Sequence, residues 1–91
     1  MEDIHIILIE DEKIVRESLS GLIDNYPGFS FMQAHHSVED FLDTQRSRTP
    51  DIVLLDIGLK GGMDGLTGIK LIKQLFPEVN IIMLTLSLIH I

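Results

Sequence analysis

Four short apolar runs constrain the fold of this chain more than any other feature of its sequence. They span His5 to Ile9, Phe29 to Ala34, Ile52 to Leu55 and Asn80 to Leu84, and most are rich in β-branched residues. Runs of this length that are apolar at consecutive positions are typical of strands covered on both faces of a parallel sheet. The four runs therefore predict four buried strands.

The three segments between these runs have the apolar spacing of amphipathic helices. In the second segment, Ser37 followed by Asp40 resembles a capping box and predicts a helix start. The residues expected on the buried faces of the first and third helices are Val15, Leu19, Leu22, Ile23, Leu66, Ile69, Ile72 and Phe76. The resulting order, βαβαβαβ, predicts an α/β fold with a parallel sheet and right-handed crossovers.

The composition excludes several classes of function. The 91 residues include 14 acidic and 7 basic side chains, for a formal charge of −7. A surface this acidic argues against nucleic-acid binding by this segment, because phosphate contacts require clustered Lys and Arg. The chain has no cysteine, which fits a reducing cytoplasm. No apolar stretch reaches the roughly 18 residues of a membrane span, so no membrane partner is expected.

Polar residues follow three of the predicted strands at the point where each strand ends. Glu10 and Asp11 follow the first strand, Asp56 follows the third and Thr85 follows the fourth. Ligands of open α/β sheets bind beyond the carboxyl ends of the strands, so these residues are expected to share one pocket. Three neighbouring carboxylates repel one another, and a hard cation such as Mg²⁺ removes that cost. One carboxylate could then attack phosphorus as a nucleophile.

A plainer interpretation exists for each of these acids alone. Acidic residues after strands commonly cap helices or lie in solvated loops. The combination is less easily explained in this way, because an acidic pair, a later Asp and a final Thr each end an apolar run. The pattern as a whole therefore favours a phosphoryl-transfer site over a set of unrelated caps.

The stretches IILIEDEKIVRESL and DIVLLDIGLKGGMDGLTGIKLIKQLFPEVNIIMLT resemble the receiver domain of bacterial two-component response regulators, the CheY-like fold. The resemblance runs from Ile4 to Thr85. It implies a flavodoxin-like, doubly wound parallel sheet with strand order 2-1-3-4. It also implies that the domain takes a phosphoryl group, that it binds Mg²⁺, and that it is not a turnover enzyme beyond possible self-dephosphorylation.

The same resemblance implies roles for particular residues. Asp56 would be the phosphoacceptor. Glu10, Asp11, Asp56 and the backbone carbonyl of Gly58 would bind Mg²⁺, with Asp11 a direct ligand. Thr85 would be the switch hydroxyl that follows the phosphoryl group.

The partners implied by the resemblance are those of a cytoplasmic signalling protein. The phosphoryl group would come from a sensor histidine kinase, with small phosphodonors as a further source. The full-length parent would be a transcription regulator with a helix-turn-helix output domain, and it would be able to dimerise.

The sequence also departs from the family pattern. Lys60 stands where the family has proline, and the loop with Gly61 and Gly62 is one residue longer. The fifth strand, the fourth and fifth helices and the catalytic lysine are missing. This predicts a truncated receiver over residues 1–85 that is not fully competent, and a chain that is unstable, oligomeric or aggregated. Residues 86–91 are interpreted as a non-native tail that resembles read-through of a sequencing adapter.

Two other functions remain open on the sequence. One is a non-catalytic pseudo-receiver that serves as an interaction module. The other is an Mg²⁺-dependent aspartyl phosphohydrolase, although such enzymes place a second acid where this chain has Gly58. The adjacent His35 and His36 are interpreted as exposed loop residues without a metal role, and His5 as a partly buried packing residue.

Overall fold

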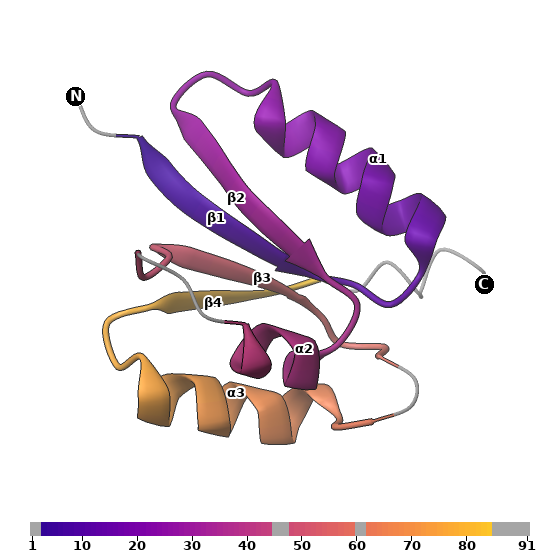
Figure 1. Cartoon of the computed structure of the whole chain (residues 1–91), viewed down its shortest axis with the longest axis vertical. Coiled ribbons are helices and arrows are strands. Elements are labelled where there is room, and N and C mark those ends of the chain that lie inside the picture. Colours follow the sequence, from indigo (N-terminus) through magenta and orange to yellow (C-terminus); the bar gives the residue numbers. More distant parts are fainter. Residues whose placement is uncertain (1–2, 45–47, 60–61, 85–91) are drawn as a thin grey trace.

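The computed structural model describes residues 3–44, 48–59 and 62–84. Strands and helices alternate along the chain, as the apolar pattern predicts (Figure 1). The elements are β1 (Ile4–Ile9), α1 (Lys13–Asp24), β2 (Phe29–His35), α2 (Val38–Asp43), β3 (Ile52–Asp56), α3 (Gly65–Leu75) and β4 (Asn80–Leu84). The α/β class is therefore confirmed, and each predicted strand agrees with the observed one to within a residue at either end. The predicted tail, residues 86–91, lies outside the described residues.

The strands form one parallel sheet in the order β2-β1-β3-β4, which confirms the predicted order. Its two inner strands are in simple register, with Ile9 opposite Leu55. The pairing of β1 with β2 shifts between Ile6 and Ile7, where Met32 is an extra residue of β2. The sequence pattern does not reveal this irregularity. The register of β1 and β3 matters most for function, because it brings the carboxyl ends of these two strands side by side.

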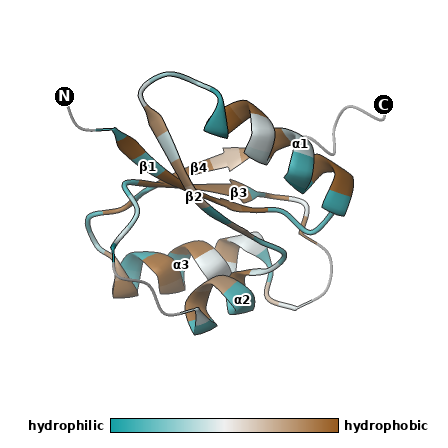
Figure 2. Cartoon of the chain, turned by 45° about the horizontal axis from the view of Figure 1, so that its top comes forward, coloured by the Kyte–Doolittle hydropathy of each residue, from teal (hydrophilic) through white to brown (hydrophobic). Residues whose placement is uncertain are grey.

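The helices lie in two layers around the sheet. Helix α1 lies on one face, over β1 and β2, while α2 and α3 lie on the other (Figures 1 and 2). Strand β1 lies between the layers, and all residues from Ile6 to Ile9 are buried. Burial on both faces explains why this strand is a continuous apolar run rather than an alternating one.

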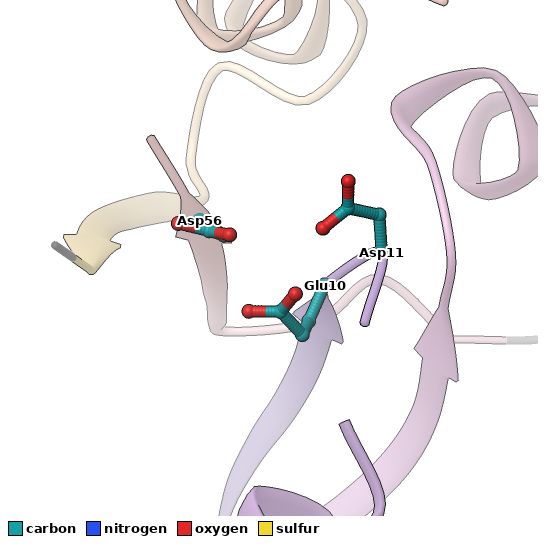
Figure 3. A group of neighbouring side chains, drawn as sticks. All are labelled: Glu10, Asp11 and Asp56. Carbon is teal, nitrogen blue, oxygen red and sulfur yellow. The ribbon is translucent and has the colours of Figure 1, made fainter. Parts of the chain in front are cut away.

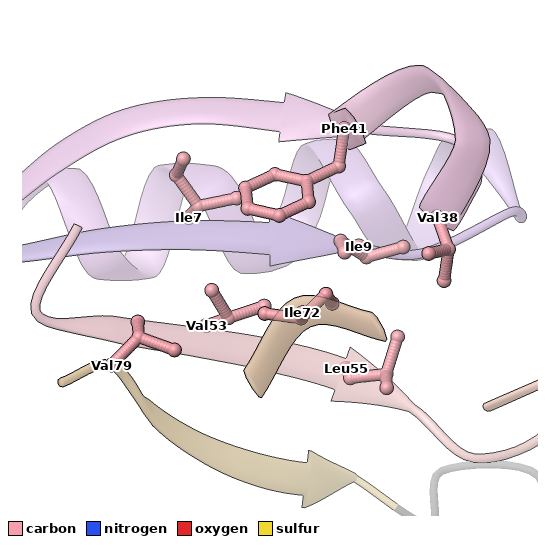
Figure 4. Packing of buried hydrophobic residues seen from close by; sticks show 8 residues of the cluster. All are labelled: Ile7, Ile9, Val38, Phe41, Val53, Leu55, Ile72 and Val79. Carbon is pink, nitrogen blue, oxygen red and sulfur yellow. The ribbon is translucent and has the colours of Figure 1, made fainter. Parts of the chain in front are cut away.

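The main core fills the space between the sheet and the α2–α3 layer (Figure 4). Its fully buried side chains are Ile7, Ile9, Val38, Phe41, Val53, Leu55, Ile72 and Val79. The ring of Phe41 packs edge-on against Phe76, with centroids 5.8 Å apart. Burial of each large apolar side chain is worth roughly 1.5–3 kcal/mol, so this cluster is the main source of stability on that face.

Two residues that were predicted on buried helix faces are exposed. Leu22 is 68% exposed and Leu66 is 67% exposed. In α1 the inward position belongs to Ile23, which leaves its neighbour Leu22 pointing away from the sheet. In α3 the inward positions include Gly65 and Gly68, so the helix meets its neighbours through small residues and Leu66 turns to solvent. Apolar spacing alone could not show which side of each helix faces the sheet.

The predicted role of His35 as an exposed loop residue is wrong. His35 ends β2 and is buried, and its Nδ1 donates to Oδ2 of Asp40 (2.8 Å). This hydrogen bond lowers the pKa of Asp40 below its ordinary value. The expected capping box is therefore only half realised: Ser37 Oγ accepts from the Asp40 backbone N–H, but the Asp40 carboxylate is turned towards the histidine.

The contact between α2 and α3 depends on the absence of a side chain at Gly68. A Cβ added there would lie 2.8 Å from Cγ2 of Val38, which is fully buried and stiff about χ1. We expect Gly68→Ala to destabilise the fold by about 1–2 kcal/mol, because the clash outweighs the helix propensity that Ala gains. Chemical denaturation measures the change.

The matched control for this substitution is Gly21→Ala. Gly21 lies in α1 with nothing within 4 Å of an added Cβ, so the change should stabilise by about 0.5–1 kcal/mol. Adding Val38→Ala to Gly68→Ala should remove the clash and leave only the cavity cost. Equal stabilisation by both glycine substitutions would show that α2 and α3 are not in close contact.

Candidate functional site

Three carboxylates converge at the carboxyl end of the sheet (Figure 3). Glu10 and Asp11 follow β1, and Asp56 is the last residue of β3. One carboxylate oxygen from each of the three lies within 4.8 Å of the others. They meet because β1 and β3 are adjacent parallel strands that end at the same level. The structure thus brings together the three acids that the sequence placed at strand ends.

A local turn lets two consecutive residues, Glu10 and Asp11, reach one site. In an extended strand their side chains would point to opposite faces. Here the chain leaves β1 after Ile9, and Arg16 Nη1 donates to the carbonyl oxygens of Glu10 (2.8 Å) and Asp11 (3.2 Å). Arg16 therefore ties the first turn of α1 to the acidic pair. Sequence reasoning missed this residue, because an Arg in a helix gives no signal of what it will contact.

Asp56 is oriented by the backbone that follows it. Its side chain is buried, with 6% of the residue exposed, and Oδ1 accepts from the Gly58 N–H (2.9 Å). The next residue, Ile57, donates its N–H to the carbonyl oxygen of Leu84 (3.0 Å). Asp56 therefore sits between the end of β1 and the end of β4. Thr85 follows Leu84 in the sequence and lies outside the described residues.

The cluster carries more negative charge than its surroundings compensate. Burial, which the Glu12 N–H that donates to Oε2 partly offsets, and the nearby carboxyl groups of Asp11 and Asp56 together raise the pKa of Glu10 to about 7. A group of hard oxygen donors of which two are buried and one, Asp11, is half-buried fits a divalent cation such as Mg²⁺. The donor set is thus suited to that ion by its chemistry as well as by its geometry.

The raised pKa of Glu10 predicts an unusual pH dependence of stability. The folded carboxyl binds its proton more tightly than the unfolded one, so the free energy of unfolding should fall as pH rises from 4.5 towards about 7. The loss should be of the order of 2–3 kcal/mol. Urea melts between pH 5 and 8 without divalent ions measure it.

Glu10→Gln is the control for this effect, since it removes the titrating group and keeps the side-chain shape. The other titratable groups are the same in both proteins, so the difference between the two pH profiles isolates the contribution of Glu10. Mg²⁺ should abolish the fall in the native chain. Identical pH profiles for the two proteins would contradict the prediction.

Sequence reasoning also missed a carboxylate that contacts the loop between β3 and α3. Glu39, in the first turn of α2, accepts the Met63 backbone N–H at Oε2 (2.7 Å). From the sequence it resembles an ordinary acid near a helix N-terminus, where the helix dipole favours negative charge. No local signal connects it with a loop that follows it by 24 residues.

Within the described residues, no helix has both the length and the apolar character needed to cross a membrane.

Comparisons of the sequence and the fold with known proteins find similarity to response regulators. The family described as "Response regulator receiver domain" matches residues 6–88. The transcriptional regulatory protein LnrK of Bacillus subtilis is 33% identical over 82 residues, which is 90% of this chain and 37% of LnrK. A protein-glutamate methylesterase/protein-glutamine glutaminase of Oleidesulfovibrio alaskensis is 32% identical over 75 residues, 82% of this chain and 20% of the relative.

A solved structure shows the same fold. It is a LuxR-family two-component response regulator from Aurantimonas sp. SI85-9A1, with a TM-score of 0.77 and 29% identity over 90% of this chain and 58% of that chain. In all three cases the chain spans less than two thirds of the relative's own length. The likeness therefore concerns one domain of larger proteins.

Proposed function

The chain belongs to the response regulator receiver domain family, and from that premise we propose that Asp56 is its phosphoacceptor. We further propose that Glu10, Asp11, Asp56 and the backbone carbonyl of Gly58 hold Mg²⁺. The observation that carries the proposal is the convergence of three carboxylates within 4.8 Å at the ends of adjacent strands. Members of this family are phosphoacceptors rather than turnover enzymes, and we assign this chain the same role.

The proposed reaction moves a phosphoryl group from a phosphohistidine of a sensor kinase to Asp56. A carboxylate oxygen of Asp56 forms a bond to phosphorus while the P–N bond breaks. The electron pair of that bond stays on the imidazole nitrogen, which then takes up a proton, and Asp56 becomes an acyl phosphate. With acetyl phosphate as donor, a P–O bond breaks instead and acetate leaves. Mg²⁺ supplies positive charge that offsets the charge of the transferring group.

Residues of the chain prepare this step before the donor arrives. The Gly58 N–H holds one oxygen of Asp56 and so fixes the plane of the carboxylate. The Glu12 N–H holds Glu10 in the same way. Placement of the acids in advance means that little reorganisation is needed when the cation and the donor bind.

The consequence of phosphorylation belongs to the same proposal. The new group adds roughly −1.5 to −2 charge at Asp56, which pairs with Leu84 at the carboxyl end of β4. Thr85 would follow the phosphoryl oxygens and so report the change. In the full-length protein, in the cytoplasm, the output would be transcription regulation through a further, helix-turn-helix domain; the LnrK relative is named a transcriptional regulatory protein. The esterase relative shows that other outputs occur beside such a domain.

The experiment that tests the proposal is an intact-mass measurement after incubation with acetyl phosphate. We expect one phosphoryl group to be gained with Mg²⁺ and none with EDTA. Rapid multiple turnover of a phosphoester would instead indicate the phosphohydrolase, although Gly58 stands where such enzymes have their second acid. Absence of both Mg²⁺ binding and phosphorylation would favour the pseudo-receiver.

A further inference from the structure

Helix α2 contacts the loop between β3 and α3 through one carboxylate. Glu39 Oε2 accepts from the Met63 backbone N–H at 2.7 Å. The next residue after Met63 is Asp64, the N-cap of α3, whose Oδ1 accepts from the Thr67 N–H (2.8 Å). Glu39 therefore holds the loop immediately before α3 begins.

The fit around this carboxylate is close and specific. Gly62 has φ +64°, a left-handed conformation that favours glycine, and a Cβ added there would lie 2.8 Å from Oε2 of Glu39. The other oxygen, Oε1, is buried and has no hydrogen-bond partner among the described residues. A buried acceptor without a partner costs roughly 1–3 kcal/mol, so the arrangement is not the one that stability alone would favour.

The loop that Glu39 holds is the one that follows Asp56. At its near end, the Gly58 N–H is bonded to Asp56 Oδ1. At its far end, the Met63 N–H is bonded to Glu39. The two hydrogen bonds hold Gly58 and Met63, which lie near the two ends of this loop. The carbonyl of Gly58 lies between these two fixed points along the chain.

We propose that Glu39 is a positioning residue for the metal site, which acts by fixing the β3–α3 loop so that the Gly58 carbonyl faces the carboxylate cluster. The inference rests on the proposed function, because it takes Gly58 as a ligand. Glu39 is not among the clustered acids that would hold the cation. It acts as an acceptor for Met63, in the way that residues behind metal ligands orient them.

The proposal makes the acceptor oxygen of Glu39 the important feature and not its charge. Glu39→Gln keeps an oxygen for the Met63 N–H and removes the charge. Glu39→Ala removes both. Glu78→Ala removes one negative charge from an exposed position in the turn before β4, away from the carboxyl ends of the strands. These three variants of the whole chain separate positioning from the general attraction of an acidic surface for cations.

Three measurements, on the metal-free chain and on the chain with Mg²⁺, test the proposal. Hydrogen exchange followed by NMR reports the Met63 amide, which should be protected in the native chain and in Glu39→Gln but not in Glu39→Ala. Calorimetric titration reports Mg²⁺ affinity, which should fall about tenfold in Glu39→Ala and stay within about twofold in Glu39→Gln and Glu78→Ala. Saturating Mg²⁺ should restore the rate of Asp56 phosphorylation in Glu39→Ala.

A substitution in the loop tests the same contact between Glu39 and the β3–α3 loop. Gly62→Ala places a methyl group against Oε2, so it should displace the carboxylate and lower Mg²⁺ affinity as Glu39→Ala does. It keeps the test decisive if Glu39→Ala does not fold, as judged by circular dichroism.

Three results would overturn the proposal. They are unchanged Mg²⁺ affinity in a folded variant that has lost Met63 protection, equal losses in the Gln and Ala variants, and unchanged affinity in Gly62→Ala. The proposed function fails separately, if the native chain binds Mg²⁺ but gains no phosphoryl group. In that case the Mg²⁺ titrations of the variants still decide the role of Glu39.

Discussion

Substitution of Asp56 by asparagine is expected to abolish phosphoryl incorporation while the chain stays folded. The amide has nearly the same shape as the carboxylate, and its oxygen can still accept the Gly58 N–H. It lacks the negative charge and the nucleophilic oxygen that bond formation to phosphorus requires. Intact-mass spectra after treatment with acetyl phosphate and Mg²⁺ should show no added phosphoryl group in Asp56→Asn and one in the native chain.

The substitution should also reduce the electrostatic repulsion among the three clustered carboxylates. With one charge fewer near Glu10, the pKa of Glu10 should move down from about 7 towards its ordinary value. Asp24→Asn, at the exposed end of α1, is the control for loss of one acid and should be phosphorylated normally. A phosphoryl group on Asp56→Asn would place the acceptor elsewhere and refute the assignment.

Asp11→Asn should weaken Mg²⁺ binding by at least about tenfold, since it removes one of three carboxylates whose oxygens lie within 4.8 Å of one another and would together hold the ion. The same change should raise the stability of the metal-free chain at pH 8, because the remaining carboxylates repel each other less. The two effects have opposite signs, so stability without Mg²⁺ and affinity for Mg²⁺ should change in opposite directions. Calorimetric titration and urea melts measure the two quantities on the same protein.

Glu17→Gln is a suitable control for Asp11→Asn, since Glu17 is an exposed acid of α1 and is absent from the cluster. Its Mg²⁺ affinity should match that of the native chain. If Asp11→Asn keeps its affinity, the ion is held without Asp11, and the direct-ligand role assigned to this residue is refuted.

The acids of the site were identifiable from the sequence because their signal is local. Glu10, Asp11 and Asp56 each follow an apolar run, and parallel strands end at a common edge. The contacts that hold them were not identifiable in this way. Arg16 donates to two carbonyl oxygens, and Glu39 accepts from an amide far along the chain. Such contacts depend on distances between elements, which no local pattern contains.

The helices show the same limit. Apolar spacing identified α1 and α3, but it placed Leu22 and Leu66 on buried faces that they do not occupy. The orientation of α3 depends on Gly65 and Gly68, which let it approach the sheet and α2 closely. His35 was misplaced for a related reason: its burial requires Asp40 and Phe41 from the next helix around it.

The sequence by itself determined the order of the elements, the parallel sheet with its 2-1-3-4 order and the edge where the acids gather. Those features follow from apolar periodicity and from a family pattern that is carried by a few motifs. Tertiary structure alone decided how far the three carboxylates are buried, how much the pKa of Glu10 rises and which side chain holds the loop after Asp56. The physical reason is that burial and electrostatic interaction depend on distances in space, and these are set only when β1, β3 and α2 pack together.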